Sequence, residues 1–434
     1  MKINFDRTYS VNFITPRAEN THGWVVVLGA CLVFIFNISL ATTFSIIFSP
    51  IFDNSDDKSV RLAMNIYEIL SNLTVICTGF MLRDLSAKHF VVIGSSLLFV
   101  GLVISSFVVN LGQLIITFSI IMGIGMGLLN PATFIAVLSC FNASRNRAIG
   151  IVFASFGLGQ LIMPPIANYL LENFTFRIVI SFVAALSLIG LVGAHLLAPI
   201  KWRSCEEHHD HYSNRIYNNN VEECQYLLPK NEEISQSSVT TKIVHATDLE
   251  LLVDYKFLAL GIGLSFILAM SVDLTKLLPT FLTTNFGLES SQAQICTYVI
   301  RIADIMARMS FAFITDAFKL SSKTVLLIGL IGTTAVRLVL LDPYLNFEFI
   351  LFVCITLGTF RAMTVINQIL IIVDFAKGRC PRRVPGMLGL CYVMKSILVV
   401  VSECLYEHLE DYNTHIFIHL GIQIIVIVLW ICII

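Results

Sequence analysis

Long apolar runs, separated by short polar loops, constrain the fold of this chain more than any other feature. An α-helix needs about 18 to 20 apolar residues to cross roughly 30 Å of hydrocarbon. Of 434 residues, 56% are hydrophobic and 13% are charged, whereas soluble domains carry about 25% charged residues. A water-soluble fold is therefore excluded, and we predict an all-α membrane protein with twelve spans at 24–49, 61–82, 90–109, 112–138, 148–170, 178–199, 256–282, 292–314, 324–341, 345–373, 384–404 and 416–434.

A long polar segment at 201–254 separates six predicted spans from six others. It is rich in Glu, Asn, Ser and His and poor in aromatic residues, a composition that favours disorder. The predicted organisation is an N-terminal segment at 1–23, a six-helix bundle at 24–200, a disordered linker at 201–254 and a second bundle at 255–434. An acidic and histidine-rich cluster at 206–211 matches no closed zinc spacing, so neither a metal nor another cofactor is expected.

The distribution of Lys and Arg predicts the orientation. Basic residues gather in alternate short loops, as at Arg145, Arg147 and positions 377–383, while the opposite loops are mainly acidic. Because cytoplasmic loops carry the excess of Lys and Arg, both termini and the linker are predicted to face the cytoplasm. Residues 1–22 lack the pattern of a cleaved signal peptide. We expect a multi-pass protein of the plasma membrane.

Three ionisable residues, Arg301, Asp304 and Arg308, lie inside the predicted span at 292–314. A charge at the bilayer centre costs roughly 2.5 to 3.5 kcal/mol and usually marks a pathway for substrate or ions. Spacings of three and four residues place all three side chains on one helix face, with one positive charge in excess. Arginine can bind a carboxylate through two parallel hydrogen bonds. The alternative is a static buried ion pair that joins this helix to a neighbour.

The same span carries the strongest resemblance to a known family. Its segment Ile302–Arg308 (IADIMAR), followed by Thr315 and Asp316, resembles the monocarboxylate transporter family of the major facilitator superfamily. Gly23 with Trp24, and the stretch from Phe141 to Ala154, resemble two further motifs of that family less closely. The resemblance implies two six-helix bundles around a central site. It also implies that Asp304 and Arg308 handle substrate and coupling ion, with the arginine contacting a carboxylate.

Two positions depart from the family pattern. Thr42 stands where proton-coupled members have a first-helix lysine, and a hydroxyl cannot carry a titrating positive charge. Ile369 stands where an aromatic residue shapes the family's substrate site, five residues before Asp374, which fits the family's Asp. These departures put coupling to protons in doubt and predict a pocket of different size or shape.

Other charged residues inside or near spans are further candidates. Arg361 and Lys395 either line the central cavity or take part in packing. Arg337 is predicted to extend to the membrane surface, and Glu68 to reach the headgroups at one end of its span. We predict structural or gating roles for Arg145, Asp84, Asp316 and an Asp273–Lys276 pair.

The expected function is transport of a small organic anion, such as the monocarboxylates lactate and pyruvate, by alternating access. One alternative is a proton-independent carrier of a larger or zwitterionic compound, such as an amino acid or a carnitine-like molecule. Another is a receptor or scaffold that transports nothing. The chain shows no catalytic motif in a suitable context, so no enzyme is expected. The expected partners are the substrate, protons, lipid and, from the family resemblance, a single-span immunoglobulin-like protein; nucleic acid is not expected.

Overall fold

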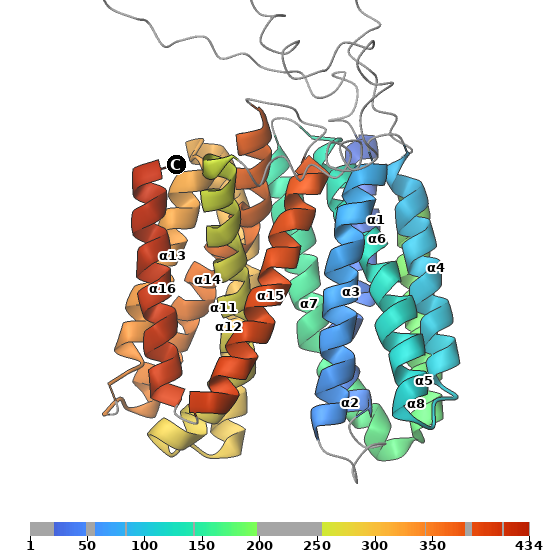
Figure 1. Cartoon of the computed structure of the whole chain (residues 1–434), viewed down its shortest axis with the longest axis horizontal. Helices are drawn as coiled ribbons and strands as arrows, with labels where there is room; N and C mark the ends of the chain where they lie inside the picture. Colours follow the sequence, from blue (N-terminus) through green and yellow to red (C-terminus); the bar gives the residue numbers. More distant parts are fainter. Residues whose placement is uncertain are drawn as a thin grey trace, which may run out of the picture.

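The computed structural model describes residues 21–48, 57–82, 85–141, 144–197, 254–342, 344–377, 384–409 and 412–433, and within these ranges the regular structure is helical throughout (Figure 1). The first group of helices comprises α1 (Thr21–Phe36), η1 (Ile38–Thr42), α2 (Phe44–Phe48), α3 (Asp57–Met81), α4 (Ala87–Ser105), α5 (Leu111–Leu114), η3 (Ile115–Met122), α6 (Gly123–Leu138), α7 (Arg145–Asn173) and α8 (Phe176–Leu196). The second comprises α11 (Tyr255–Phe286), α12 (Ser290–Phe318), α13 (Ser322–Val339), α14 (Phe347–Lys377), α15 (Val384–Leu409) and α16 (Tyr412–Ile433).

Each of the twelve predicted spans coincides with helical structure. The first is not one straight helix, because a 3₁₀ turn, η1, separates α1 from α2. By length and hydropathy, seven stretches in the described ranges can cross a membrane, at Gly23–Leu40, Ala87–Ser105, Leu111–Leu138, Arg145–Asn173, Phe176–Leu196, Ser322–Val339 and Phe347–Ala376. Helix α12 is not among them, since charged and polar side chains interrupt its apolar sequence.

Small residues bring the helices of the first group into close contact. A Cβ atom added to Gly29 would lie 2.6 Å from the carbonyl oxygen of Gly193, and one added to Gly94 would lie 2.6 Å from that of Gly125. These pairs join α1 to α8 and α4 to α6. Glycine permits such backbone contact in membrane proteins, where packing rather than the hydrophobic effect holds helices together.

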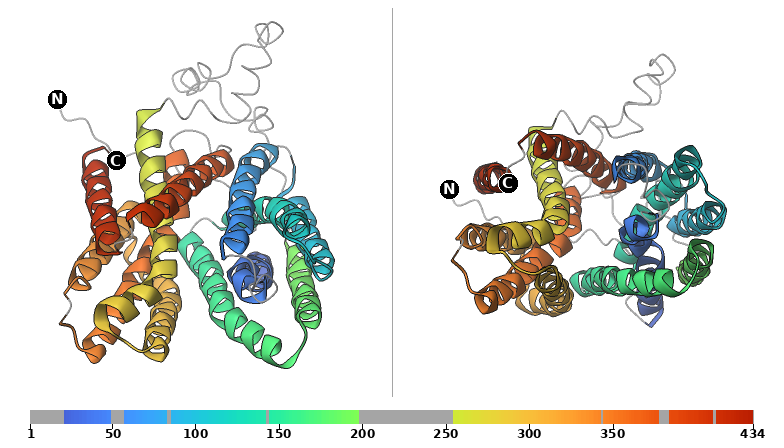
Figure 2. Two further views of the ribbon diagram at one scale, coloured as in Figure 1. Left: turned by 60° about the horizontal axis from the view of Figure 1, so that its bottom comes forward. Right: turned by 90° about the horizontal axis from the view of Figure 1, so that it is seen from below.

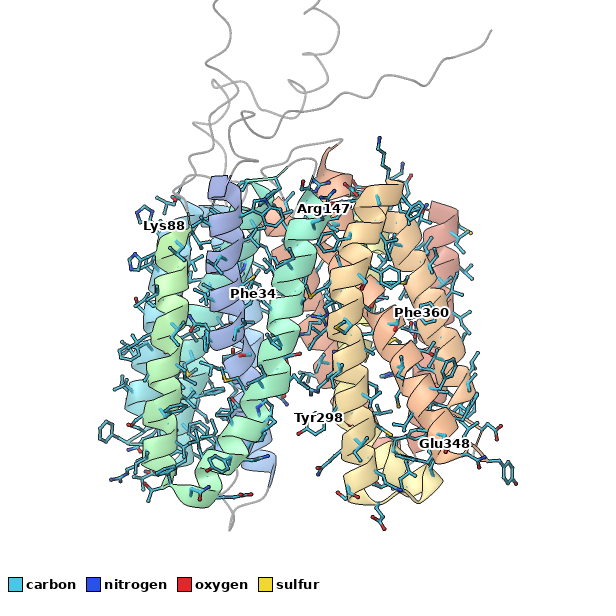
Figure 3. The ribbon with its side chains drawn as sticks, turned by 180° about the vertical axis from the view of Figure 1, so that it is seen from behind. Phe34, Lys88, Arg147, Tyr298, Glu348 and Phe360 are labelled. Carbon is cyan, nitrogen blue, oxygen red and sulfur yellow. The ribbon has the colours of Figure 1, made fainter. Side chains whose placement is uncertain are left out.

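Two interfaces connect the two groups of helices. Helix α7 packs on α12, and α3 packs on α15; seen from below, these interfaces lie on opposite sides of the molecule (Figure 2). We call the end at which α8 ends and α11 begins the linker end. Figure 3 shows α7 and α12 close together at the linker end, near Arg147, and diverging toward the opposite end.

Candidate substrate site

An ion pair between Asp304 and Arg308 occupies the middle of α12. The Arg308 guanidinium donates from Nε to Asp304 Oδ1 at 3.0 Å and from Nη2 to Oδ2 at 2.5 Å. Its Nη1 donates to the backbone carbonyl of Phe153 on α7 at 2.8 Å. Both residues are buried, with exposures of 4% for Asp304 and 1% for Arg308. The predicted four-residue pairing is therefore present, and it faces the other group of helices rather than lipid.

Helix α7 covers this ion pair because glycines let it approach α12 closely. A Cβ atom at Gly150 would collide with the Ala312 side chain, and one at Gly157 would lie 2.7 Å from Ile305 Cγ1. In this conformation Arg308 is buried against α7 and does not face an open cavity. Its access to substrate depends on separation of α7 from α12.

A second arginine reaches the same carboxylate from α14. Arg361 Nη1 lies 3.9 Å from Asp304 Oδ2, and its Nε donates to the Ser271 hydroxyl on α11 at 3.1 Å. A Cβ atom at Gly358, one turn earlier on α14, would lie 3.1 Å from the backbone nitrogen of Asp304. Glycine at this position therefore allows α14 to come close enough for Arg361 to approach Asp304.

The third cation, Arg301, lies at the α7–α12 interface, where its Nη1 donates to the Gln160 carbonyl at 3.2 Å. Arg301 precedes Asp304 by three residues on the same helix, so these four side chains, three guanidinium groups and one carboxylate, carry two positive charges in excess. Such an excess in a membrane interior favours an anionic ligand.

Beside Arg361, a small cavity lies within the second group of helices. It has room for about one water-sized group. Its polar lining consists of two arginines, three hydroxyl side chains and one amide, contributed by Arg337, Arg361, Ser271, Thr333, Thr364 and Gln423.

The position of Arg337 corrects one prediction. This residue does not extend to the membrane surface, since it is 9% exposed and its Nη1 donates to Gln423 Oε1 at 2.9 Å. The buried Gln423 amide on α16 therefore supplies the hydrogen-bond acceptor that Arg337 would otherwise find among the headgroups. Hydropathy along α13 cannot reveal this partner, which lies three helices further along the chain.

On the opposite side of the molecule, Lys395 of α15 forms an ion pair with Glu68 of α3. One turn along α3, the Asn72 amide donates to the Ser396 hydroxyl. Glu68 was predicted to reach the headgroups, but it lies near the middle of α3 and is paired across the α3–α15 interface. The sequence contains a sign of this ion pair, because two opposite charges occur at similar depth in two different spans.

Ion pairs also join the two groups at the linker end. Arg145 Nη2 lies 3.2 Å from Asp374 Oδ1, and the Ser322 hydroxyl donates to Asp374 Oδ2 at 2.6 Å. Arg147 Nε donates to Asp316 Oδ2 at 2.9 Å. Arg145 and Asp316, for which structural or gating roles are predicted, each belong to one of these two ion pairs.

The remaining predicted positions fall in several places. Ile369 is 1% exposed and belongs to the hydrophobic core. The backbones of Thr42, Asp273 and Lys276 lie in η1 and α11, but their side chains are outside the described part of the structure. Asp84, the 206–211 cluster and the predicted linker up to residue 253 lie outside the described residues. Among the residues that are described, no group of three or more His, Cys, Asp or Glu could hold a metal ion.

Comparison with known proteins agrees with this architecture. The sequence model of the Major Facilitator Superfamily matches residues 26–401, across both groups of helices. The chain belongs to the Major Facilitator Superfamily. It is accordingly a membrane carrier and not an enzyme, and the all-α fold predicted from the sequence is confirmed.

Several relatives of this superfamily member have names that refer to transport. The chain is 24% identical to human monocarboxylate transporter 12 over 308 residues, which are 70% of this chain and 58% of the relative. It is 26% identical to the Xenopus laevis protein of the same name over 302 residues, covering 68% and 62%. A riboflavin transporter of Trypanosoma brucei brucei is 25% identical over 194 residues, covering 43% and 35%. The chain therefore spans about six tenths of the length of its monocarboxylate transporter 12 relatives.

Proposed function

We propose that this carrier moves a small organic anion of the monocarboxylate class across the plasma membrane by alternating access. The observation that supports the proposal most directly is the cluster of three arginines around Asp304. A carboxylate bound there reduces the positive excess and can accept two parallel hydrogen bonds from one guanidinium. Similarity to proteins named monocarboxylate transporter 12 favours the same substrate class.

In the proposed cycle, substrate enters from the end opposite the linker, where α7 and α12 diverge (Figure 3). Bound anion offsets repulsion among Arg301, Arg308 and Arg361. The two groups of helices then rock about the central site, and the ion pairs at the linker end separate. If the linker end is cytoplasmic, as the distribution of Lys and Arg predicts, the described conformation faces outward, with both termini in the cytoplasm.

Uptake into proteoliposomes tests this function. The purified chain should take up labelled lactate, pyruvate or a ketone body with saturable kinetics, and external unlabelled substrate should stimulate exchange. Empty liposomes and the Asp304→Asn variant are the controls. Absence of saturable uptake for every monocarboxylate tested, from protein shown to be correctly folded, would contradict the proposal.

A proton-independent carrier of a larger or zwitterionic compound is the second candidate. It is favoured by Ile369, which lies in the core where an aromatic residue would shape a monocarboxylate pocket, and by the riboflavin transporter among the relatives. The same liposomes separate the two candidates when an inward proton gradient is imposed. Uptake of a proton-coupled monocarboxylate should rise with the gradient, whereas uptake of an amino acid or a carnitine-like compound by this second mechanism should not respond. Association with a single-span immunoglobulin-like protein stays a prediction from the family resemblance.

A further inference from the structure

We propose that Arg361, assisted by Ser271, is the residue that receives the substrate carboxylate, and that Arg308 is a positioning residue held by Asp304. This inference rests on the proposed transport of an organic anion and assigns its binding contact. It differs from the interpretation based on the family resemblance, in which Arg308 contacts the carboxylate.

The contacts of Arg308 leave little room for substrate. Two of its nitrogens donate to Asp304 and the third donates to the Phe153 carbonyl. The guanidinium also lies over the Phe153 ring, 5.9 Å from its centroid. A substrate carboxylate could replace Asp304 only by breaking this buried ion pair and both of its hydrogen bonds, which is unfavourable.

The contacts of Arg361 are different. Its Nε donates to Ser271, and the Asp304 oxygen that lies 3.9 Å from Nη1 is beyond hydrogen-bond distance. The Arg361 side chain is 17% exposed and borders the cavity. Guanidinium groups have five N–H donors, so the Nη edge of Arg361 can still bind an anion through two hydrogen bonds.

The cavity beside Arg361 limits the chemical group that can bind. Apolar side chains of Ile267, Met270, Leu330 and Leu357 complete its wall. Because the space is about the size of one water molecule, it can take one oxygen of a carboxylate but not a ring or an alkyl chain. We infer that the ligand is a carboxylate whose head group enters beside Arg361 while the rest of the molecule stays between the two groups of helices.

Binding at Arg361 can also be transmitted to the α7–α12 interface. Asp304 lies between Arg361 and Arg308, so neutralisation of Arg361 by substrate removes a competing attraction on the Asp304 carboxylate. Asp304 then pairs with Arg308 alone, and Arg308 contacts Phe153 of α7. The ion pair therefore couples the occupied site to the helix that must move.

Kinetic measurements on Arg361→Gln, Arg361→Lys and Arg308→Lys test the assignment, with the exposed Arg177→Gln as a matched control. We expect Arg361→Gln to raise the KM for the transported carboxylate about tenfold or more, because a charged, two-point contact is lost. Arg361→Lys should give a smaller increase, since lysine restores the charge without the paired geometry. Arg308→Lys should lower the maximal rate while KM changes less than threefold.

Ser271→Ala provides a second test that preserves charge and volume almost completely. It should raise the KM for the transported carboxylate about threefold. In a separate experiment on the wild type, an arginine reagent should label Arg361, and substrate should reduce that labelling when it is mapped by mass spectrometry. The inference is overturned if Arg361→Gln keeps a KM within twofold of the wild type, or if substrate protects Arg308 instead. Failure of the wild type to transport any carboxylate contradicts the proposed function itself, so the two outcomes are distinguishable.

Discussion

At the scale of single residues, Gly358 shows how one missing side chain sets the geometry of the site. A Cβ atom there would contact the Ile300 carbonyl and lie 3.0 Å from Ala303 Cβ. Because most of these neighbours belong to the α12 backbone, they cannot move aside individually. Overpacking of this kind typically costs about 1 to 3 kcal/mol.

We therefore predict that Gly358→Ala lowers the melting temperature of the purified protein and raises the KM for the transported anion, since Arg361 is displaced from Asp304. Gly421→Ala is the matched control, because its added Cβ would have no neighbour within 4 Å. Thermal melting in detergent and uptake in liposomes provide the two measurements. Equal melting temperatures for both variants would show that α14 does not need this close approach.

The sequence predicts some of the site residues but not their contacts. The four-residue spacing of Asp304 and Arg308 fixes their pairing, because both lie on one turn of one helix. Arg361 joins them from another helix, and its approach depends on the packing of α14 against α12. The burial of Arg308 likewise depends on the Phe153 carbonyl, a backbone group that no side-chain pattern reveals.

At the scale of helices, the α3–α15 interface combines an ion pair with apolar contact. Glu68 pairs with Lys395, and a Cβ atom at Gly389 would lie 2.9 Å from Ile76 Cα. Removal of one partner from a fully buried pair costs about 3 to 5 kcal/mol. The cost here should be smaller, since the Glu68 side chain is 29% exposed.

We predict that Glu68→Gln and Lys395→Gln each reduce the transport rate severalfold, because each leaves one charge without its partner across the interface. The reversed pair, Glu68→Lys with Lys395→Glu, should recover a substantial part of the rate. A double-mutant cycle measures the coupling, and the exposed Glu172→Gln is the control. Additive effects of the two single variants would show that the pair carries no functional interaction.

Helix positions were easier to predict than helix partners. Apolar length predicted positions that all prove helical, although only seven stretches in the described ranges are long and apolar enough to cross a membrane. It did not predict the 3₁₀ turn η1 after Phe36, where the buried Asn37 amide donates to Ser95 on α4 at 3.0 Å. Such tertiary hydrogen bonds depend on which helices are neighbours, and hydropathy contains no information about that.

At the scale of the whole molecule, the contacts between α7 and α12 are unevenly placed along their length. They run from Arg147–Asp316 at the linker end to Arg301–Gln160 near the middle, and beyond that point the two helices diverge (Figure 3). Because Arg147 is 42% exposed, its pair should contribute only about 0 to 1 kcal/mol. A pair this weak can be broken and re-formed in each transport cycle.

We predict that the double variant Arg145→Gln, Arg147→Gln has a severalfold larger population of forms open at the linker end. Loss of the two ion pairs destabilises the closed form, and each ~1.4 kcal/mol of such destabilisation changes the equilibrium constant between closed and open forms tenfold. Labels at exposed Leu85 and Leu320 should report a longer mean distance, whereas labels at exposed Phe174 and Ser290, at the opposite end, should report a shorter one. Labels attached through non-cysteine chemistry avoid the exposed native thiols of Cys77 and Cys432.

Opposite changes at the two ends are expected only if the groups of helices rock as units about the central site. A longer distance at both ends would instead indicate that the two groups of helices separate from each other. That result would contradict alternating access, in which the arginine cluster is exposed to one side of the membrane at a time.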